Sequence, residues 1–251
     1  MFENKRILVT GSSRGIGFAT AKAFLDAGAI VAVNGRTAKS TADGIQRLGG
    51  SDRLIAAAGD VGSVAGCEAM VAHAIDALGG LDVLVNSAGI DIGVSLEDGD
   101  EAAWDAIMNI NLKGTYFCTR AAAPALRESC GNIVNVGSDS SFMGMEDMSI
   151  YCASKGGVLM LARALSRELA PEVRVNCVCP GFVDTDMVRR DYIDRAEDPA
   201  ETLRLVEGYS PLNRMGQPAE IAAAILYLAS EQAGFVTGSA LSIDGGMTAS
   251  Y

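Results

Sequence analysis

Short apolar segments alternate with amphipathic segments along the whole chain, and the two patterns predict different elements. Near-continuous apolar runs of strand length occupy residues 6–10, 29–34, 53–58, 81–86, 132–137, 173–179 and 240–243. Apolar residues at helical spacing follow at 15–27, 38–48, 63–78, 100–127 and 218–229, and a further helix begins near Tyr151. The charged stretch after 173–179 shows no clear period, so we expect it to be irregular.

Strands that are apolar on both faces and alternate with helices are typical of a parallel sheet with helices on both sides. The order therefore predicts a single α/β domain over residues 1–251, doubly wound in the Rossmann manner, with a seven-stranded parallel sheet. Ligands of such sheets bind beyond the carboxyl ends of the strands. The candidate site accordingly comprises residues 11–17, 35–36, 60–61, 86–89, 138 and 180–185.

The composition narrows the class of partner. The formal net charge is -11, which would repel the phosphate backbone of a nucleic acid. The longest clear apolar run, residues 221–229, is too short to cross a membrane as a helix. The N-terminal segment reads as a strand entering a turn, not as a signal peptide. We therefore expect a cytoplasmic protein that binds neither nucleic acid nor a membrane.

The cysteines and the single histidine suggest neither a metal site nor a redox site. The six cysteines lie at positions 67, 118, 130, 152, 177 and 179, with no CxxC pair and no histidine at ligand spacing. We expect small buried hydrophobic residues, with Cys177 and Cys179 on the same face of a strand. His73 lies between polar positions of a predicted helix, so we expect it on the surface. One histidine argues against a Ser-His-Asp triad.

The segment TGSSRGIG, residues 10–17, follows the first strand and opens the first helix. Gly11 permits the turn, Gly15 lets the backbone approach a pyrophosphate, and Gly17 lets the helix pack on the strand. The helix N-terminus then offers unpaired N–H groups to the phosphates. Glycine also occurs in tight turns that bind nothing, but this position in a parallel sheet favours dinucleotide binding.

The end of the second strand bears on the choice between NAD and NADP. Enzymes that use NAD usually place an acidic residue there, which accepts a hydrogen bond from the ribose 2′-OH. This chain reads VNGRT at 33–37, with Gly35 at the expected position of the acid. Arg36, together with Arg14 in the glycine loop, suits a 2′-phosphate, although both could be solvated surface residues. NADP(H) is therefore favoured, and NAD(H) is the alternative.

Seven segments resemble, in order, the motifs of the short-chain dehydrogenase/reductase family, and the similarity spans essentially the whole chain. TGSSRGIG resembles the TGxxxGxG motif, DV at 60–61 the adenine-contacting pair, and NSAG at 86–89 the NNAG motif with Ser87 substituted. NINLKG supplies Asn111, and Ser138 stands 13 residues before Tyr151. YCASK is similar to the YxxxK motif and PGFVDT to PGxVxT.

The resemblance implies a catalytic group of Asn111, Ser138, Tyr151 and Lys155. Tyr151 would act as the general acid in reduction and the general base in oxidation, while Lys155 would lower its pKa and hold the nicotinamide ribose. Ser138 would hydrogen-bond the reacting oxygen, and Asn111 would support a water relay. Purely structural alternatives remain, because Ser138 could be a turn residue and Asn111 a helix-interior kink.

The resemblance also implies the cofactor-binding residues. The Val183 backbone and Thr185 would fix the nicotinamide carboxamide, although Thr185 could equally be the N-cap of the next helix. The complete set is Gly11, Ser13, Arg14, Gly15, Ile16, Gly17, Arg36, Asp60, Val61, Asn86, Ala88, Gly89, Tyr151, Lys155, Pro180, Gly181, Val183 and Thr185.

Elementary electrostatics explains why a lysine should follow the tyrosine by one helical turn. Tyr151 and Lys155 are four residues apart and therefore share one helix face. To exchange a proton near pH 7, the tyrosine pKa must fall from about 10, which requires roughly 4 kcal/mol. An ammonium about 4 Å away supplies about 4 kcal/mol at an effective dielectric of about 20. We therefore expect Lys155 to lower the pKa of Tyr151.

The substrate is encoded less clearly than the cofactor. Residues 186–217 mix apolar and charged side chains beside the site, which is typical of a mobile lid. The serines and methionines at 138–148 suit a small or medium polar ketone or secondary alcohol, such as a sugar, polyol or hydroxy acid. The resemblance further implies a homotetramer.

Three other functions are open to the same sequence. A 3-oxoacyl-[acyl-carrier-protein] reductase would need basic residues for its acidic carrier protein, and this chain reads IDIG after NSAG where those reductases usually carry ITRD. A non-catalytic NADP(H)-sensing regulator would usually lack the tyrosine or the lysine, and this chain keeps both. Sugar-nucleotide epimerases usually carry a TGxxGxxG loop and a longer C-terminal region, which this chain lacks.

Overall fold

The computed structural model describes residues 1–250, and its centre is one sheet of seven strands in the order β3-β2-β1-β4-β5-β6-β7. The strands are β1 Arg6–Val9, β2 Ile30–Val33, β3 Leu54–Ala56, β4 Val83–Asn86, β5 Asn132–Val136, β6 Arg174–Pro180 and β7 Ala240–Ile243. Every neighbouring pair is parallel. The strand order reverses at β1 and β4, so ligands are expected between their carboxyl ends. The predicted doubly wound fold is confirmed.

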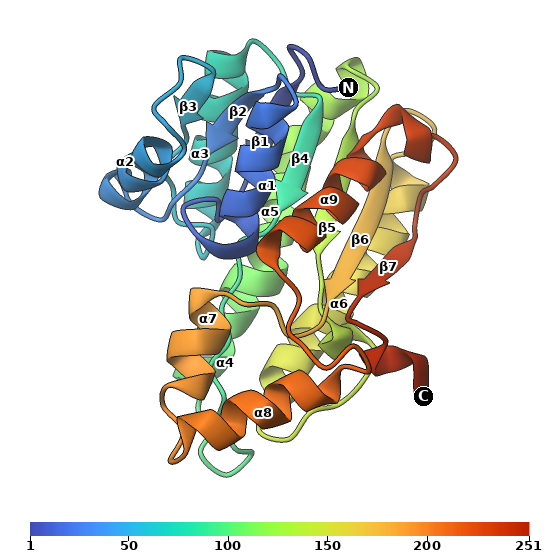
Figure 1. Ribbon diagram of the computed structural model, residues 1–251. Coiled ribbons are helices and arrows are strands. Elements are labelled where there is room, and N and C mark those ends of the chain that lie inside the picture. The colour runs from blue at the N-terminus through green and yellow to red at the C-terminus, as the bar shows by residue number, and fades with distance from the viewer. Residues whose placement is uncertain (251) are drawn as a thin grey trace.

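Helices cover both faces of the sheet (Figure 1). They are α1 Gly15–Asp26, α2 Ala38–Arg47, α3 Val64–Leu78, α4 Glu101–Met108, α5 Gly114–Glu128, α6 Ser149–Glu168, α7 Asp186–Val188, α8 Pro199–Tyr209 and α9 Pro218–Ala229. Five short turns of helix complete the order: η1 Asn109–Lys113, η2 Asp139–Ser141, η3 Arg189–Ile193, η4 Glu231–Ala233 and η5 Met247–Ser250. The helix predicted over 100–127 is therefore interrupted, since the π-helical turn η1 separates α4 from α5.

Each strand divides its side chains between two cores. Val9 and Val85 pack with α1 and α9 on one face, whereas Leu8 and Leu84 pack with α3, α5 and α6 on the other. Because both faces are buried, the strands are apolar throughout, which is the pattern seen in the sequence. The cysteines at 67, 118, 177 and 179 are buried, and the last two face the same core, as predicted. For the other two the prediction of burial is wrong, because Cys130 is exposed and Cys152 is only half-buried.

The prediction of an irregular segment after β6 is wrong, because this segment folds into helices with a small core of its own. The turns α7 and η3 are followed by α8, and Ile193, Val206 and Met215 are buried between them. Asp198 caps α8 by accepting hydrogen bonds from the N–H groups of residues 200 and 201 at 3.0 Å. The helices α7 and α8 lie beyond the carboxyl edge of the sheet, where the candidate site is (Figure 1).

Within residues 1–250, no helix combines the length and the apolar character that crossing a bilayer requires. His73 is exposed, as predicted, and its Nε2 lies 3.1 Å from the carbonyl oxygen of Ala56.

Candidate active site

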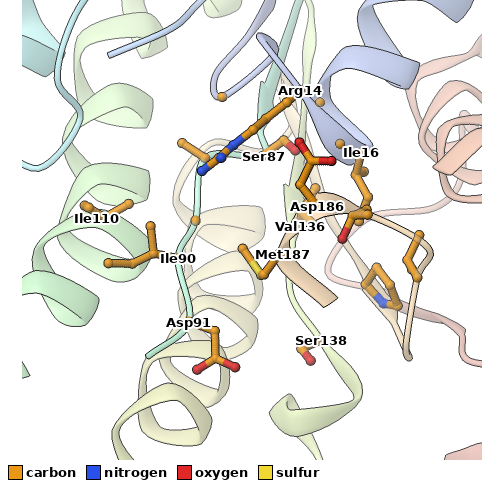
Figure 2. Close-up of a pocket in the computed structure, with 18 of the residues that line it drawn as sticks. Arg14, Ile16, Ser87, Ile90, Asp91, Ile110, Val136, Ser138, Asp186 and Met187 are labelled. Atoms are coloured by element: carbon orange, nitrogen blue, oxygen red, sulfur yellow. The ribbon is translucent and has the colours of Figure 1, made fainter. Parts of the chain in front are cut away.

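A cavity of about 580 Å³ opens at the carboxyl edge of the sheet. Figure 2 shows Arg14 and Ser87 at one end of it and Asp91 and Ser138 at the other. The sequence-predicted residues that line it are Gly11, Ser13, Arg14, Gly15, Ile16, Gly17, Arg36, Asp60, Val61, Ala88, Gly89, Ser138, Tyr151, Lys155, Pro180, Gly181, Val183 and Thr185. Asn86 and Asn111 are not among its lining residues. The cavity therefore lies at the strand ends where the sequence predicts a site.

The glycine loop is shaped so that backbone can approach a ligand closely. Gly11 has φ +63°, and a Cβ there would lie 2.7 Å from the Cα of Ala88. A Cβ on Gly17 would lie 2.5 Å from the Gly11 carbonyl oxygen, so only glycine lets α1 start this close to the turn. Arg14, the N-cap residue, makes no side-chain cap, which leaves the first N–H groups of α1 for an anion. The loop fits a pyrophosphate.

Two buried polar side chains that the sequence analysis missed hold the loops of this edge together. The Asn34 side chain accepts a hydrogen bond from the Gly11 N–H at 2.9 Å and donates to the carbonyls of Ala57 and Gly59 at 2.8 and 3.1 Å. Thr10 Oγ1 accepts from the N–H groups of residues 87 and 88 at 3.0 and 3.1 Å. A polar residue that directly ends an apolar strand was the signal available for both.

The end of β2 has no room for an acidic side chain at position 35. A Cβ on Gly35 would lie 2.6 Å from Ser40 Oγ and 2.9 Å from the backbone nitrogen of Thr41. Arg14 and Arg36 are exposed and line the cavity beside this position. These two guanidinium groups bring positive charge to this end of the cavity, which Asp60 also lines.

The reacting end is built on one face of α6. Lys155 is buried, and its Nζ donates a hydrogen bond to the Val136 carbonyl at 2.9 Å while lying 5.6 Å from the ring centroid of Tyr151. Ser138 Oγ donates to Asp139 Oδ1 at 2.7 Å and accepts from the Ser140 N–H at 3.2 Å. Ser138 thus caps the short turn η2 and also lines the cavity, so its role in the turn does not exclude contact with a ligand.

The pKa of Tyr151 moves in the direction opposite to the one predicted. Burial raises the pKa of Tyr151 above 10, the charges of Asp91 and Asp139 raise it further, and a hydrogen bond with Ser138 lowers it. Burial also lowers the pKa of Lys155. The prediction counted favourable positive charge and left out desolvation and the two carboxylates, which the fold places near the phenol.

Asn111 and Asn86 support the site from outside the cavity. The Asn111 side chain accepts from the Ile90 N–H and donates to the Ile90 carbonyl, both at 2.9 Å, and also donates to Ser154 Oγ at 3.1 Å. It therefore fixes the chain after β4. Asn86 donates to Thr119 Oγ1 at 3.0 Å and to Asn135 Oδ1 at 2.9 Å, which ties β4 to β5 and α5.

Thr185 is both a cavity residue and a cap. It precedes α7, and its Oγ1 accepts a hydrogen bond from the Val188 N–H at 3.5 Å. The two interpretations left open by the sequence are therefore compatible.

No cluster of three or more histidine, cysteine or acidic side chains in the described chain is arranged to hold a metal ion.

Two carboxyl groups at the reacting end were not predicted as site residues. Asp91 lines the cavity, and burial raises its pKa to about 6. Asp139 is buried beside Ser138, and burial raises its pKa as well. No periodicity or motif marks either residue, because their burial results from tertiary packing.

Comparisons with known proteins extend over nearly the whole chain. The family model described as enoyl-(acyl carrier protein) reductase matches residues 11–248. A 2-(S)-hydroxypropyl-CoM dehydrogenase of Xanthobacter autotrophicus is 39% identical over 98% of this chain and 98% of its own. A 3-oxoacyl-[acyl-carrier-protein] reductase of Chlamydia muridarum is 38% identical over 97% of both chains. A solved structure from Sinorhizobium meliloti, described as a candidate short-chain alcohol dehydrogenase, has a TM-score of 0.90 at 38% identity and covers 99% of this chain and 98% of that one.

Proposed function

This chain belongs to the short-chain dehydrogenase/reductase family and is an oxidoreductase that acts on CH–OH groups; we propose that it transfers a hydride between NADP(H) and a small or medium ketone or secondary alcohol. The observation that carries the proposal is the cavity itself. Ser138, Tyr151 and Lys155 line it together with the glycine loop. The bound nicotinamide nucleotide would supply the hydride or accept it.

Tyr151 is the proposed proton donor and acceptor. In oxidation it takes the hydroxyl proton of the alcohol as the hydride leaves the carbinol carbon, and in reduction it returns the proton to the new alkoxide. Ser138 hydrogen-bonds the reacting oxygen, which stabilises its developing charge. Lys155 holds the ribose and adds a positive charge near the phenol. Asn111 is a positioning residue that fixes the backbone at Ile90.

The backbone after β6 supports the proposed orientation of the nicotinamide. The Asp184 N–H donates to the Gly216 carbonyl at 2.8 Å, and the Gly216 N–H donates to the Phe182 carbonyl at 2.9 Å. In an extended segment the N–H and C=O groups of Val183 then point to the opposite side, away from this pairing. Val183 lines the cavity, so these groups suit a carboxamide.

The remaining assignments belong to the same proposal. Gly35 and the two arginines favour NADP(H), while NAD(H) is the alternative. The segment 186–217 would act as a lid within a single domain, since Met187, Val188 and Tyr192 from it line the cavity.

Free cysteine sulfurs 3.8 Å apart at 177 and 179 suit the reducing cytoplasm. Exposed Trp104, Tyr116 and Met160 on α4, α5 and α6 suit contacts within a homotetramer.

Reduction of 3-oxoacyl groups on acyl carrier protein is the second candidate, because one relative carries that name at 38% identity. The net charge of -11 weighs against it, since an acidic carrier protein would be repelled. A cofactor-sensing regulator is a third candidate. The presence of both Tyr151 and Lys155 in the cavity weighs against it.

A panel of carbonyls and alcohols, read by nicotinamide absorbance with both cofactors, tests the proposal. Tyr151→Phe should reduce kcat to less than about a hundredth of wild type with little change in cofactor Kd, because the phenol supplies only the proton. Lys155→Met should lower kcat and also weaken the binding of the cofactor. Tyr227→Phe, at an exposed tyrosine on α9 that does not line the cavity, is the matched control and should behave as wild type. Turnover by Tyr151→Phe near the wild-type rate would refute the proton-transfer role.

A further inference from the structure

Asp91 brings a carboxylate to the reacting end of the cavity. Figure 2 shows its side chain and that of Ser138 at the same end, on opposite sides. Its Oδ1 is buried, and no donor among residues 1–250 hydrogen-bonds to it. Burial raises the pKa of this carboxyl group, and the backbone N–H of Ile92 lowers it by a smaller amount. A buried carboxylate oxygen without a donor is uncommon in proteins and calls for an explanation.

Asp91 lines the same cavity as Tyr151 and Lys155 and interacts electrostatically with both. Its charge acts on Tyr151 and raises the pKa of that phenol, and it acts in the same way on Tyr192 from the segment after α7. Lys155 acts on Asp91 in return and lowers its pKa, although burial dominates. Met145 and Met148 complete the lining of this end and offer no hydrogen-bond donor except backbone. Ser140, Lys155 and Tyr192 also line the cavity and carry side-chain donors, but none of them hydrogen-bonds to Asp91 Oδ1.

We propose that Asp91 determines substrate specificity, and that the substrate carries a hydrogen-bond donor, either hydroxyl or ammonium, on the carbon next to the reacting one. This inference rests on the proposed function, since it assumes that the reacting oxygen lies at Ser138 and Tyr151. The donor of the substrate hydrogen-bonds to the carboxylate of Asp91, a residue that lines the cavity and has one oxygen without a partner. Discrimination of this kind is strong because an analogue without the donor leaves a buried polar atom unpaired.

The same carboxylate disfavours an anionic substituent at that position. A carboxylate or sulfonate next to the carbinol carbon would face Asp91 in a largely desolvated cavity, where like charges repel strongly. Of the polar substrates that suit the sequence, sugars and polyols therefore fit, and hydroxy acids with a carboxylate on the neighbouring carbon do not.

Four secondary alcohols of similar size test the inference in the wild-type enzyme. They share the CH₃–CH(OH) group and differ in the neighbouring substituent: butane-2,3-diol, 3-aminobutan-2-ol, 3-methylbutan-2-ol and lactate. We expect kcat/KM for the diol or the amino alcohol to exceed that for 3-methylbutan-2-ol by about ten- to a hundred-fold, with lactate slowest. A preference for the amino alcohol identifies an ammonium donor, and a preference for the diol a hydroxyl.

Variants of Asp91 assign that preference to the carboxylate. Asp91→Ala should remove the preference while turnover of 3-methylbutan-2-ol persists, and Asp91→Asn should keep a preference for the diol but lose one for the amino alcohol, because its Oδ1 is neutral. Glu97→Gln is the control, an exposed residue of the same connection with the same change of charge. Cofactor Kd and the unfolding midpoint report whether each variant is folded.

The outcomes separate the two proposals. Tyr151-dependent turnover of the panel with a substrate order that Asp91→Ala leaves unchanged overturns the role of Asp91 alone. A wild type that prefers lactate overturns it as well. A folded, cofactor-binding protein that oxidises none of the four overturns the proposed function together with this inference.

Discussion

Ser138 has one hydroxyl hydrogen, and two oxygen atoms compete for it. It donates this hydrogen to Asp139 Oδ1 at 2.7 Å, yet the same hydrogen is needed to stabilise a tyrosinate at Tyr151. While Asp139 holds it, the Ser138 oxygen can only accept from the phenol, which favours the neutral tyrosine. Asp139 therefore raises the pKa of Tyr151 through its own charge and through its hold on Ser138.

Asp139→Asn should move the pH profile of alcohol oxidation toward lower pH. Oxidation requires deprotonated Tyr151, so kcat/KM rises as pH approaches the tyrosine pKa from below. The substitution removes a negative charge that raises this pKa and weakens the acceptor that holds the Ser138 hydrogen, so both effects lower it. The measurement is kcat/KM for a secondary alcohol against pH, with saturating oxidised cofactor.

Asp147→Asn makes the same change of charge on the exposed loop that precedes α6. Its backbone has φ +57°, which asparagine tolerates, and its side chain is exposed. Its profile should match that of wild type. An unchanged or more alkaline profile for Asp139→Asn would show that Asp139 does not control the phenol.

At the scale of elements, the sequence was sufficient to predict the sheet and the position of the cavity at its carboxyl edge. Both follow from apolar runs whose length and order are local properties, and from glycines at strand ends. The helix α8 was missed although Asp198 and Pro199 form a strong N-terminal signal, because its charges obscured the apolar period. The π-helical turn η1 was missed because no pattern distinguishes it from ordinary helix.

The polar supports of the site were harder to predict than its lining. Asn34 and Thr10 act through hydrogen bonds between loops that are far apart in the sequence. Asp91 lies beyond the NSAG motif, and it lines the cavity together with Lys155 of α6 and Tyr192 of the segment after α7. Residues of this kind become visible only once the strand ends have been brought together.

The glycine loop yields a prediction about the junction between β1 and α1. Gly17→Ala places a Cβ 2.5 Å from the Gly11 carbonyl oxygen and 3.0 Å from the Cα of Ser12, and backbone cannot yield as a flexible side chain would. We expect the unfolding free energy to fall by about 1–3 kcal/mol and cofactor affinity to fall with it. Chemical denaturation and a cofactor titration measure both effects.

Gly208→Ala is the matched control. It makes the same substitution near the end of α8, where a Cβ meets nothing within 4 Å. It should leave cofactor affinity unchanged and raise stability by up to about 1 kcal/mol, because alanine favours helix. If Gly17→Ala behaves like this control, the loop is not packed as tightly as its geometry indicates.

At the scale of the whole molecule, the net charge of -11 opposes an anionic cofactor, so the attraction must come from local groups. The exposed side chains of Arg14 and Arg36 supply positive charge beside Gly35. Charged hydrogen bonds to a 2′-phosphate are worth about 1.5–3 kcal/mol each, less where solvent and salt screen them. Because a cofactor that binds only the native state stabilises it, a difference in affinity between two cofactors appears as a difference in the free energy of unfolding.

Thermal unfolding with each cofactor therefore reports the specificity of the cavity. If NADP⁺ binds at least tenfold more tightly than NAD⁺, equal saturating concentrations differ in stabilisation by about 1.4 kcal/mol. In a chain of this size that corresponds to a higher midpoint with NADP⁺ by about 3–6 °C. Arg36→Asp should reverse the order, because it removes a positive charge and adds a group that repels the phosphate and can bind a ribose 2′-OH.

Lys39→Asp separates this local effect from the general charge of the molecule. Lys39 lies on α2, and its side chain is 83% exposed and pairs with Asp43 at 2.8 Å. It is not among the residues that line the cavity, although its substitution changes the net charge by the same amount as Arg36→Asp. The control should lower the midpoint slightly through loss of the pair but leave the difference between the cofactors intact. Two results would show that Arg36 does not select the cofactor. One is a higher unfolding midpoint with NAD⁺ than with NADP⁺ in wild type. The other is that Arg36→Asp and Lys39→Asp reduce the midpoint difference between the cofactors equally.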